Sequence, residues 1–132
     1  MKVIIAVIIL AIICGCQNNS DSPTEITSHK LGVAFDLRIG ETVSIQDEQL
    51  TIQFVNVPND SRCPEGAVCV WAGNAVVELK VSNILDTLNT FVSPSELTSG
   101  IYTIRLLNLS PYPKIDLPRD TTLYVAQLVV TK

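Results

Sequence analysis

Apolar and polar residues alternate along most of the chain after residue 30, which is the pattern of strands that bury one face. Turn-forming glycine, proline, asparagine and aspartate residues separate seven such segments. The predicted strands cover residues 31–39, 42–45, 50–57, 69–81, 88–92, 101–109 and 123–131. Segment 93–97 is predicted as a loop or a brief helical turn. The pattern therefore predicts an all-β fold.

Seven short strands with turns between them favour a single antiparallel β-sandwich of immunoglobulin-like size, and a closed barrel is the alternative. One strand changes phase along its length. Leu50, Ile52 and Phe54 share one face, and the apolar positions then move to the opposite face at Val55 and Val57. We therefore expect a bulge near Phe54.

The predicted strand 69–81 is the longest and is expected to lie in the core. Small or apolar residues occupy every second position from Cys69 to Val81, whereas the opposite phase includes Glu78. Because side chains alternate between the faces of a strand, Trp71 is expected to be buried next to Cys69.

The first thirty residues have the pattern of a targeting signal followed by a linker. An apolar run at 3–13 is too short to span a bilayer, which takes about 20 residues, and suits a signal peptide. The following Ile13-Cys14-Gly15-Cys16 resembles the cleavage box of bacterial lipoproteins. That resemblance implies that Cys16 is acylated with diacylglycerol and becomes the first residue of the mature chain. A secreted protein cleaved elsewhere, or an uncleaved anchor, is the alternative.

We accordingly divide the chain into a lipoprotein signal peptide at 1–15, a lipidated flexible tether at 16–30 and a β-sandwich domain at 31–132. The only histidine, His29, falls on the tether and is expected to be solvated. The resemblance implies a membrane-anchored protein of the bacterial cell envelope. Gln17 replaces the aspartate that retains many lipoproteins at the inner membrane, which favours the outer membrane.

The four cysteines fit this division. Cys14 leaves with the leader and Cys16 takes the lipid, so Cys63 and Cys69 are left to pair in an oxidising compartment. Their disulfide closes a short loop. It is either a staple or a device that stiffens residues 60–68 for recognition.

Two exposed features are candidates for recognition. Arg62 lies between Asp60 and Glu65 in the loop of residues 60–68, and the alternative role is a local ion pair that contributes little in water. Tyr112 is held between two prolines and is suited to contacts. Its alternative role is to fold back over an open end of the sandwich.

Candidate catalytic and metal-binding sets are missing from the sequence pattern. A single histidine on the tether gives no nucleophile–base pair and no zinc set, and no acidic spacing typical of calcium loops is present. We expect no metal and no cofactor. The net charge is −4, without a basic stripe, so a nucleic-acid partner is not expected.

Two motifs carry a resemblance to a known family. The runs Asp60-Ser61-Arg62-Cys63-Pro64 and Cys69-Val70-Trp71-Ala72-Gly73, followed by Leu109-Ser110-Pro111-Tyr112-Pro113, are similar to a family of small secreted or lipid-anchored domains of Bacteroidetes-type bacteria. No activity is assigned to that family. The resemblance implies one domain with a Cys63–Cys69 disulfide, and it implies no active site.

The sequence therefore predicts a non-enzymatic cell-envelope lipoprotein with a binding or structural β-sandwich and a protein partner in the envelope. One alternative is an inhibitor of an envelope protease that presents the Arg62 loop. Such a protein is similar in size and form to chagasin-type inhibitors, whose loop motifs this chain lacks. A second alternative is a small hydrolase that uses converging carboxylates.

The anchor prediction is tested by Cys16→Ser. We expect this variant to lose its acyl chains and to move from the membrane fraction to the soluble fraction, because no other residue supplies the lipidated thiol. Mass spectrometry of the mature N-terminus is the measurement. An unmodified N-terminus in the unaltered protein would contradict the prediction.

Overall fold

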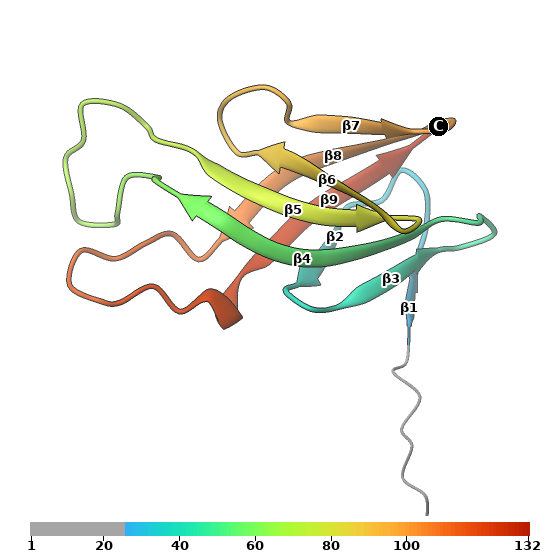
Figure 1. Ribbon diagram of the computed structural model, residues 1–132, viewed down its shortest axis with the longest axis horizontal. Coiled ribbons are helices and arrows are strands. Elements are labelled where there is room, and N and C mark those ends of the chain that lie inside the picture. The colour runs from blue at the N-terminus through green and yellow to red at the C-terminus, as the bar shows by residue number, and fades with distance from the viewer. Residues whose placement is uncertain (1–25) are drawn as a thin grey trace, which may run out of the picture.

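A computed structural model describes residues 26–132, which fold into two β-sheets packed face to face (Figure 1). The described residues contain nine strands and one short 3₁₀ turn, η1 (Thr121–Leu123). The strands are β1 (Thr27–His29), β2 (Phe35–Arg38), β3 (Thr42–Ile45), β4 (Thr51–Asp60), β5 (Ala75–Val81), β6 (Ile84–Asn89), β7 (Glu96–Ser99), β8 (Tyr102–Ser110) and β9 (Val125–Thr131). The predicted signal peptide, Cys16 and most of the predicted tether lie outside the described residues.

The strand order confirms the predicted antiparallel sandwich. One sheet has the order β1-β3-β4-β5-β6, and the other has the order β2-β9-β8-β7. Every neighbouring pair is antiparallel except β1 and β3, which are parallel. Within residues 26–132, no helix is long and apolar enough to cross a membrane.

The core lies between the sheets and follows the predicted alternation. On β5, Ala75, Val77, Leu79 and Val81 are buried, and the residues between them are partly or fully exposed. The predicted phase change on β4 is also confirmed. Its register with β5 shifts after Phe54, so that the next buried residue is three positions later.

Two strands were placed wrongly by the sequence pattern. The predicted strand 88–92 is instead β6, which begins at Ile84, because Ser82 and Asn83 both have positive φ and make a two-residue hairpin turn. The predicted strand 69–81 begins only at Ala75.

The count of about seven strands was also too low. The predicted loop or helical turn at 93–97 ends in β7, whose Leu97 is buried. The first predicted strand, 31–39, shortens to β2. The remaining addition is β1, which falls inside the predicted tether.

β1 shows that the domain begins before the predicted boundary at residue 30. Thr27, Ser28 and His29 pair with β3, and the backbone carbonyl of His29 accepts a hydrogen bond of 2.7 Å from the amide of Gln46. The His29 ring stacks on Phe35 with 4.5 Å between ring centroids. His29 is therefore partly buried on the domain, contrary to the prediction of a solvated side chain.

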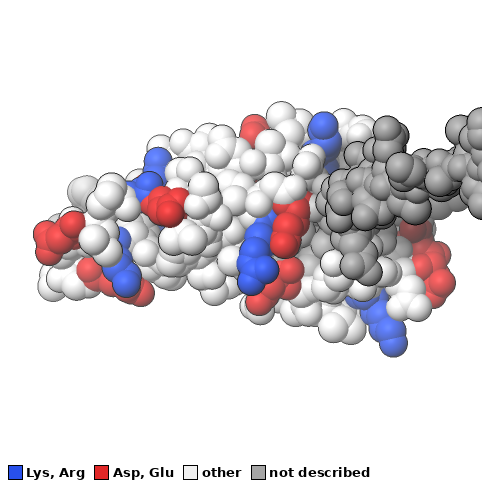
Figure 2. Space-filling model, turned by 90° about the horizontal axis from the view of Figure 1, so that it is seen from below, with Lys and Arg blue, Asp and Glu red and all other residues white. Residues whose placement is uncertain are grey.

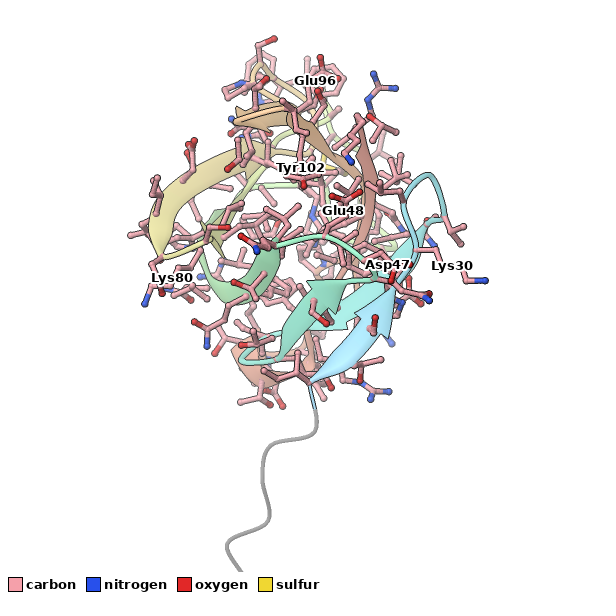
Figure 3. The ribbon with its side chains drawn as sticks, turned by 90° about the vertical axis from the view of Figure 1, so that its right-hand side faces the viewer. Lys30, Asp47, Glu48, Lys80, Glu96 and Tyr102 are labelled. Carbon is pink, nitrogen blue, oxygen red and sulfur yellow. A yellow bond between two sulfur atoms is a disulfide. The ribbon has the colours of Figure 1, made fainter. Side chains whose placement is uncertain are left out.

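A polar cluster links the two sheets at the end where β7 meets β8 (Figure 3). The Tyr102 hydroxyl donates to the Glu48 carboxylate at 2.5 Å, and the Lys132 ammonium lies 2.6 Å from the same carboxylate. These bonds, led by the one from Lys132, hold the pKa of Glu48 below its usual range. The cluster joins the β3–β4 turn to strands of the other sheet.

The core makes a direct prediction about two phenylalanines. Phe54 is fully buried, so Phe54→Ala is expected to lower the free energy of unfolding by about 3–5 kcal/mol. Phe91 is 71% exposed, and Phe91→Ala is expected to change it by less than about 0.5 kcal/mol. Urea unfolding followed by circular dichroism measures both, and equal effects would contradict the assignment of the core.

Candidate functional site

Three connections leave the sandwich at the same end, on the left of Figure 1. They join β4 to β5, β6 to β7, and β8 to β9. We call this end, made of residues 61–74, 90–95 and 111–124, the loop end. Because β4, β6 and β8 all run toward it, the topology gathers residues from three distant parts of the sequence.

A buried ion pair lies at the base of the loop end. The Arg62 guanidinium binds the Asp60 carboxylate through two hydrogen bonds, of 2.9 Å from Nε and 2.7 Å from Nη2. The side chains are 3% and 0% exposed. The amide of Arg62 adds a hydrogen bond of 3.2 Å to the same carboxylate. The paired, planar geometry is the arrangement that best offsets the cost of burying both charges.

The same ion pair connects the two sheets. Arg62 also donates to the backbone carbonyls of Leu109 and Pro111, the latter at 2.8 Å, where the chain leaves β8. Tyr124 immediately precedes β9, and its hydroxyl donates a hydrogen bond of 2.7 Å to the Asp60 carboxylate. The C-terminal end of β4 is thereby fixed to the beginning and the end of the 111–124 loop.

The charges in this cluster stabilise one another. Burial alone would raise the pKa of Asp60, but hydrogen bonds from Arg62 and then Tyr124 outweigh burial and hold the pKa below its ordinary value. Burial and the same carboxylate raise the pKa of Tyr124. The pKa of Arg62 is raised, because its bonds to Asp60 outweigh the effect of burial. At neutral pH, Asp60 and Arg62 are therefore both charged, and the Tyr124 hydroxyl keeps its proton.

Arg62 was predicted as an exposed recognition residue, and this prediction is wrong. The residue is 4% exposed, and its predicted local ion pair with Asp60 is buried rather than solvated. Its remaining acceptors lie 47 and 49 residues away in the sequence, so local spacing could not indicate them. Arg62 positions the loops and cannot itself meet a partner.

Tyr112 folds back onto the domain, as its alternative predicted role requires. Its ring lies over the Arg62 guanidinium, with 4.4 Å from the guanidinium carbon to the ring centroid. This cation–π contact folds the tyrosine back over the ion pair. The residue nevertheless remains 47% exposed and available for contact.

The predicted Cys63–Cys69 disulfide is confirmed. It closes the tip of the 61–74 loop, which continues the β4–β5 hairpin through backbone hydrogen bonds from Ser61 to Asn74 and from Cys63 to Ala72. Glu65, a predicted recognition residue, is exposed, and its amide donates to the carbonyl of Pro113 at 2.8 Å. The disulfide loop therefore rests on the 111–124 loop.

Trp71 was predicted in the core, and this prediction is wrong. It is 79% exposed, and its neighbours Val68 and Val70 are 103% and 89% exposed. The regular two-residue alternation of β5 does not extend back through Gly73, because this residue has φ of +69°, outside the range of a strand. Only glycine fits there, since a Cβ would lie 1.9 Å from the carbonyl oxygen of Ser61. The backbone turns at this glycine, and the tryptophan points outward.

Asn74 holds the 90–95 loop in place, and nothing in the sequence around Asn74 indicated this role. Its side-chain amide donates to Asn89 at 2.8 Å, and its side-chain oxygen accepts from the amide of Phe91 at 3.0 Å. The hydroxyl of Thr90 accepts from the amide of Ala75 at 2.9 Å. All three loops are therefore held by specific polar contacts.

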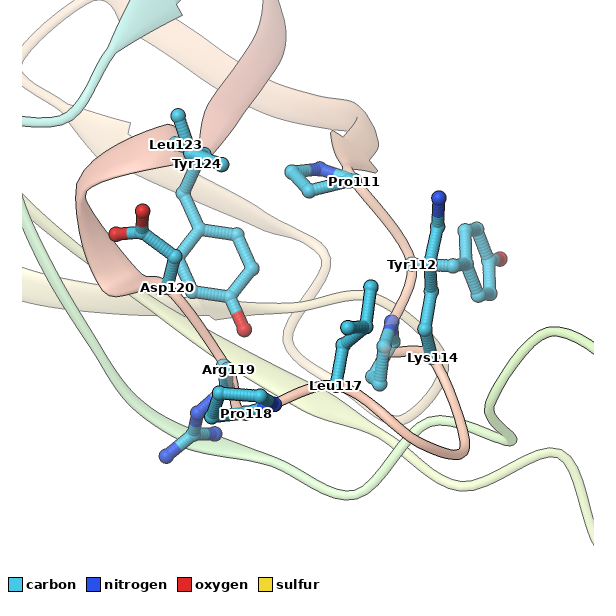
Figure 4. A pocket seen from close by; sticks show the side chains of 10 residues that line it. Pro111, Tyr112, Lys114, Leu117, Pro118, Arg119, Asp120, Leu123 and Tyr124 are labelled. Carbon is cyan, nitrogen blue, oxygen red and sulfur yellow. The ribbon is translucent and has the colours of Figure 1, made fainter.

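A pocket of about 230 Å³ lies within the 111–124 loop (Figure 4). The buried Tyr124 ring lines it, and in Figure 4 this ring lies between Asp120 on one side and Pro111 and Leu117 on the other. Its full lining is Pro111, Tyr112, Pro113, Lys114, Leu117, Pro118, Arg119, Asp120, Leu123 and Tyr124. The sequence analysis singled out only Tyr112 among these residues, because the others carry no motif. The pocket is apolar with a charged rim.

The loop end carries a concentration of exposed apolar side chains. Those at least 46% exposed are Val68, Val70, Trp71, Phe91, Val92, Tyr112, Ile115, Leu117 and Leu123. Exposed apolar side chains gathered at one end of a domain make that end a candidate interaction site. Within residues 26–132, no group of three or more metal-ligating side chains comes together.

Comparisons with known proteins return no match, whether with protein-family models, with curated proteins or with solved structures. The family resemblance of the cysteine, tryptophan and glycine motifs stays a prediction.

The ion pair makes a prediction about stability. Asp60→Asn and Arg62→Ala each leave a buried group without its partner, and each is expected to lower the free energy of unfolding at pH 7 by about 3–5 kcal/mol. The exposed Asp116→Asn is a matched control, with an expected change below about 0.5 kcal/mol. Urea unfolding is the measurement.

The pH dependence follows from the sign of the Asp60 shift. Because the folded pKa is depressed, the stabilisation is present above the ordinary value of 3.8 and is lost as the pH falls through the lower folded pKa. As the pH falls from 3.8 through the folded pKa, Asp60→Asn should therefore lose less stability than the unaltered protein does. An unchanged acid slope would contradict the role of Asp60.

Proposed function

We propose that this protein is a non-enzymatic binding module, anchored by lipid to the bacterial cell envelope, and that its loop end binds another protein. The observation that supports this most is the set of exposed apolar side chains on three loops that are each fixed in place. A flexible apolar tip would lose conformational entropy on binding, and fixing the loops beforehand reduces that loss.

The stiffness of the loops supports a binding role. The disulfide, the Asp60–Arg62 pair and Asn74 each restrain a different connection. Val70 and Trp71 are therefore presented on a backbone that is already ordered. Exposed aromatic residues on ordered backbone are common anchors of protein interfaces.

Surface charge favours a protein over a nucleic acid. Figure 2 shows acidic and basic side chains interspersed with uncharged surface, and the chain as a whole has a net charge of −4. Phosphate backbones require clustered cations. An apolar surface with mixed charges around it is instead typical of protein interfaces.

The position of β1 is compatible with an anchor. β1 pairs with β3, and β3 pairs with the first residues of β4, far from the end of β4 that leads into the loop end. The preceding chain thus joins the sandwich away from the apolar loops, as Figure 1 shows. A lipid on Cys16 would leave the loop end open to a partner.

The alternative functions gain less support. An inhibitor that presents Arg62 is inconsistent with the burial of that side chain. For a carboxylate hydrolase, the best pair is Glu65 and Asp116, which line the same open groove. Both residues are exposed, so neither lies in the water-excluded surroundings that usually tune a catalytic acid.

Site-specific photo-crosslinking in cells tests the proposal. A benzophenone amino acid at Val70 or Ile115 is expected to form adducts with the same envelope protein. The matched positions Ile84, at the start of β6, and Ile101, in the turn between β7 and β8, are similarly exposed but lie at the opposite end of the sandwich. They should give several times less of that adduct. Equal adducts from both ends, or adducts with lipid alone, would overturn the proposal.

A further inference from the structure

The pocket in the 111–124 loop has a fixed shape. Its Tyr124 ring is 2% exposed and is held through its hydroxyl by the Asp60 carboxylate. Pro111, Pro113 and Pro118 contribute to the lining, and proline has a restricted backbone. A pocket of this kind exists before any ligand arrives, so little ordering is needed on binding.

The volume of the pocket limits what it can hold. A cavity of about 150 Å³ is enough for benzene, whereas pockets for drug-sized ligands and cofactors have about 300–1,000 Å³. The value of about 230 Å³ therefore suits one aromatic side chain and excludes a whole cofactor. The lining of leucine, proline and tyrosine is apolar, as such a ring requires.

The rim of the pocket carries excess positive charge. Lys114 and Arg119 line it, and neither forms an ion pair within residues 26–132. The one carboxylate on the rim, Asp120, accepts hydrogen bonds from the amide and hydroxyl of Thr122, at 2.9 and 2.6 Å. Figure 4 shows Lys114 and Arg119 on different sides of the pocket.

An open groove continues from the pocket. It is lined by Glu65, Gly66 and residues 114–117, and it shares Lys114 and Leu117 with the pocket. A ligand in the pocket therefore has a path along the seam between the disulfide loop and the 111–124 loop. An extended peptide fits this shape better than an isolated small molecule does.

We infer that the pocket binds an aromatic side chain flanked by carboxylates, on an extended segment of a partner protein. This inference rests on the proposed function and specifies the chemistry that the loop end recognises. The ring would enter between Leu117, Leu123 and Tyr124. The carboxylates on either side of it would meet Lys114 and Arg119.

Three capped peptides test the inference: acetyl-Asp-Phe-Asp-amide, its Asn-Phe-Asn analogue and its Asp-Ala-Asp analogue. Each is titrated into the ¹⁵N-labelled full chain carrying Cys16→Ser, and amide shifts are followed by NMR. The first peptide is expected to shift the amides of residues 111–124. Loss of the ring should weaken binding by at least about tenfold. Loss of the two carboxylates should weaken it by about two- to fivefold.

Variants distinguish binding in the pocket from non-specific binding of the peptide elsewhere on the domain. Leu123→Asp places a carboxylate in the wall and should abolish binding of acetyl-Asp-Phe-Asp-amide. Ile101→Asp makes the same change at a similarly exposed site on the opposite end and should leave binding unchanged. In the double variant Lys114→Gln, Arg119→Gln, the Asp-Phe-Asp and Asn-Phe-Asn peptides should bind equally. The dispersion of each spectrum reports whether the variant is folded.

The inference would be overturned by no saturable shift with acetyl-Asp-Phe-Asp-amide, or by equal binding of the phenylalanine and alanine peptides. Shifts that map outside residues 111–124 would do the same. Crosslinking from Val70 can succeed in any of these cases, so failure of the pocket is distinguishable from failure of the loop end as a binding surface.

Discussion

The loop end depends on one buried ion pair, between Asp60 and Arg62. It forms where β4 ends, and its remaining hydrogen-bonding capacity is satisfied by backbone carbonyls at the end of β8 and by the tyrosine that precedes β9. Such a pair gives little net stability compared with well-packed apolar side chains. Its effect is geometric, because its hydrogen bonds tie the end of β4 to the end of β8 and to the residue before β9.

The two ends of the molecule are ordered by different kinds of interaction. Away from the loop end, alternating apolar residues pack between the sheets and account for most of the stabilisation. At the loop end, apolar side chains point outward, and order comes from the disulfide, from Asn74 and from the ion pair. The loops can therefore expose a large apolar surface without being drawn into the core.

The sequence was sufficient for features that depend on local pattern. Alternation along β5 and β9, the phase change on β4 and the pairing of the two remaining cysteines were all predicted correctly. Local pattern was misleading at Trp71, because a two-residue period cannot show that the backbone turns at Gly73. It was also insufficient for Arg62, whose partners in β8 are distant in the sequence. The pocket could not be predicted from local pattern either, because its lining residues come together only when the 111–124 loop folds back on Tyr124.

The outward turn at Gly73 has an evolutionary consequence. Val68, Val70 and Trp71 make almost no contribution to the core, whereas the residues that shape their loop are Asp60, Arg62, the two cysteines and the glycine. Substitutions at the three tip positions are thus nearly free of any folding constraint. The choice of residue at these positions can therefore follow what they contact outside the fold while the underlying scaffold stays the same.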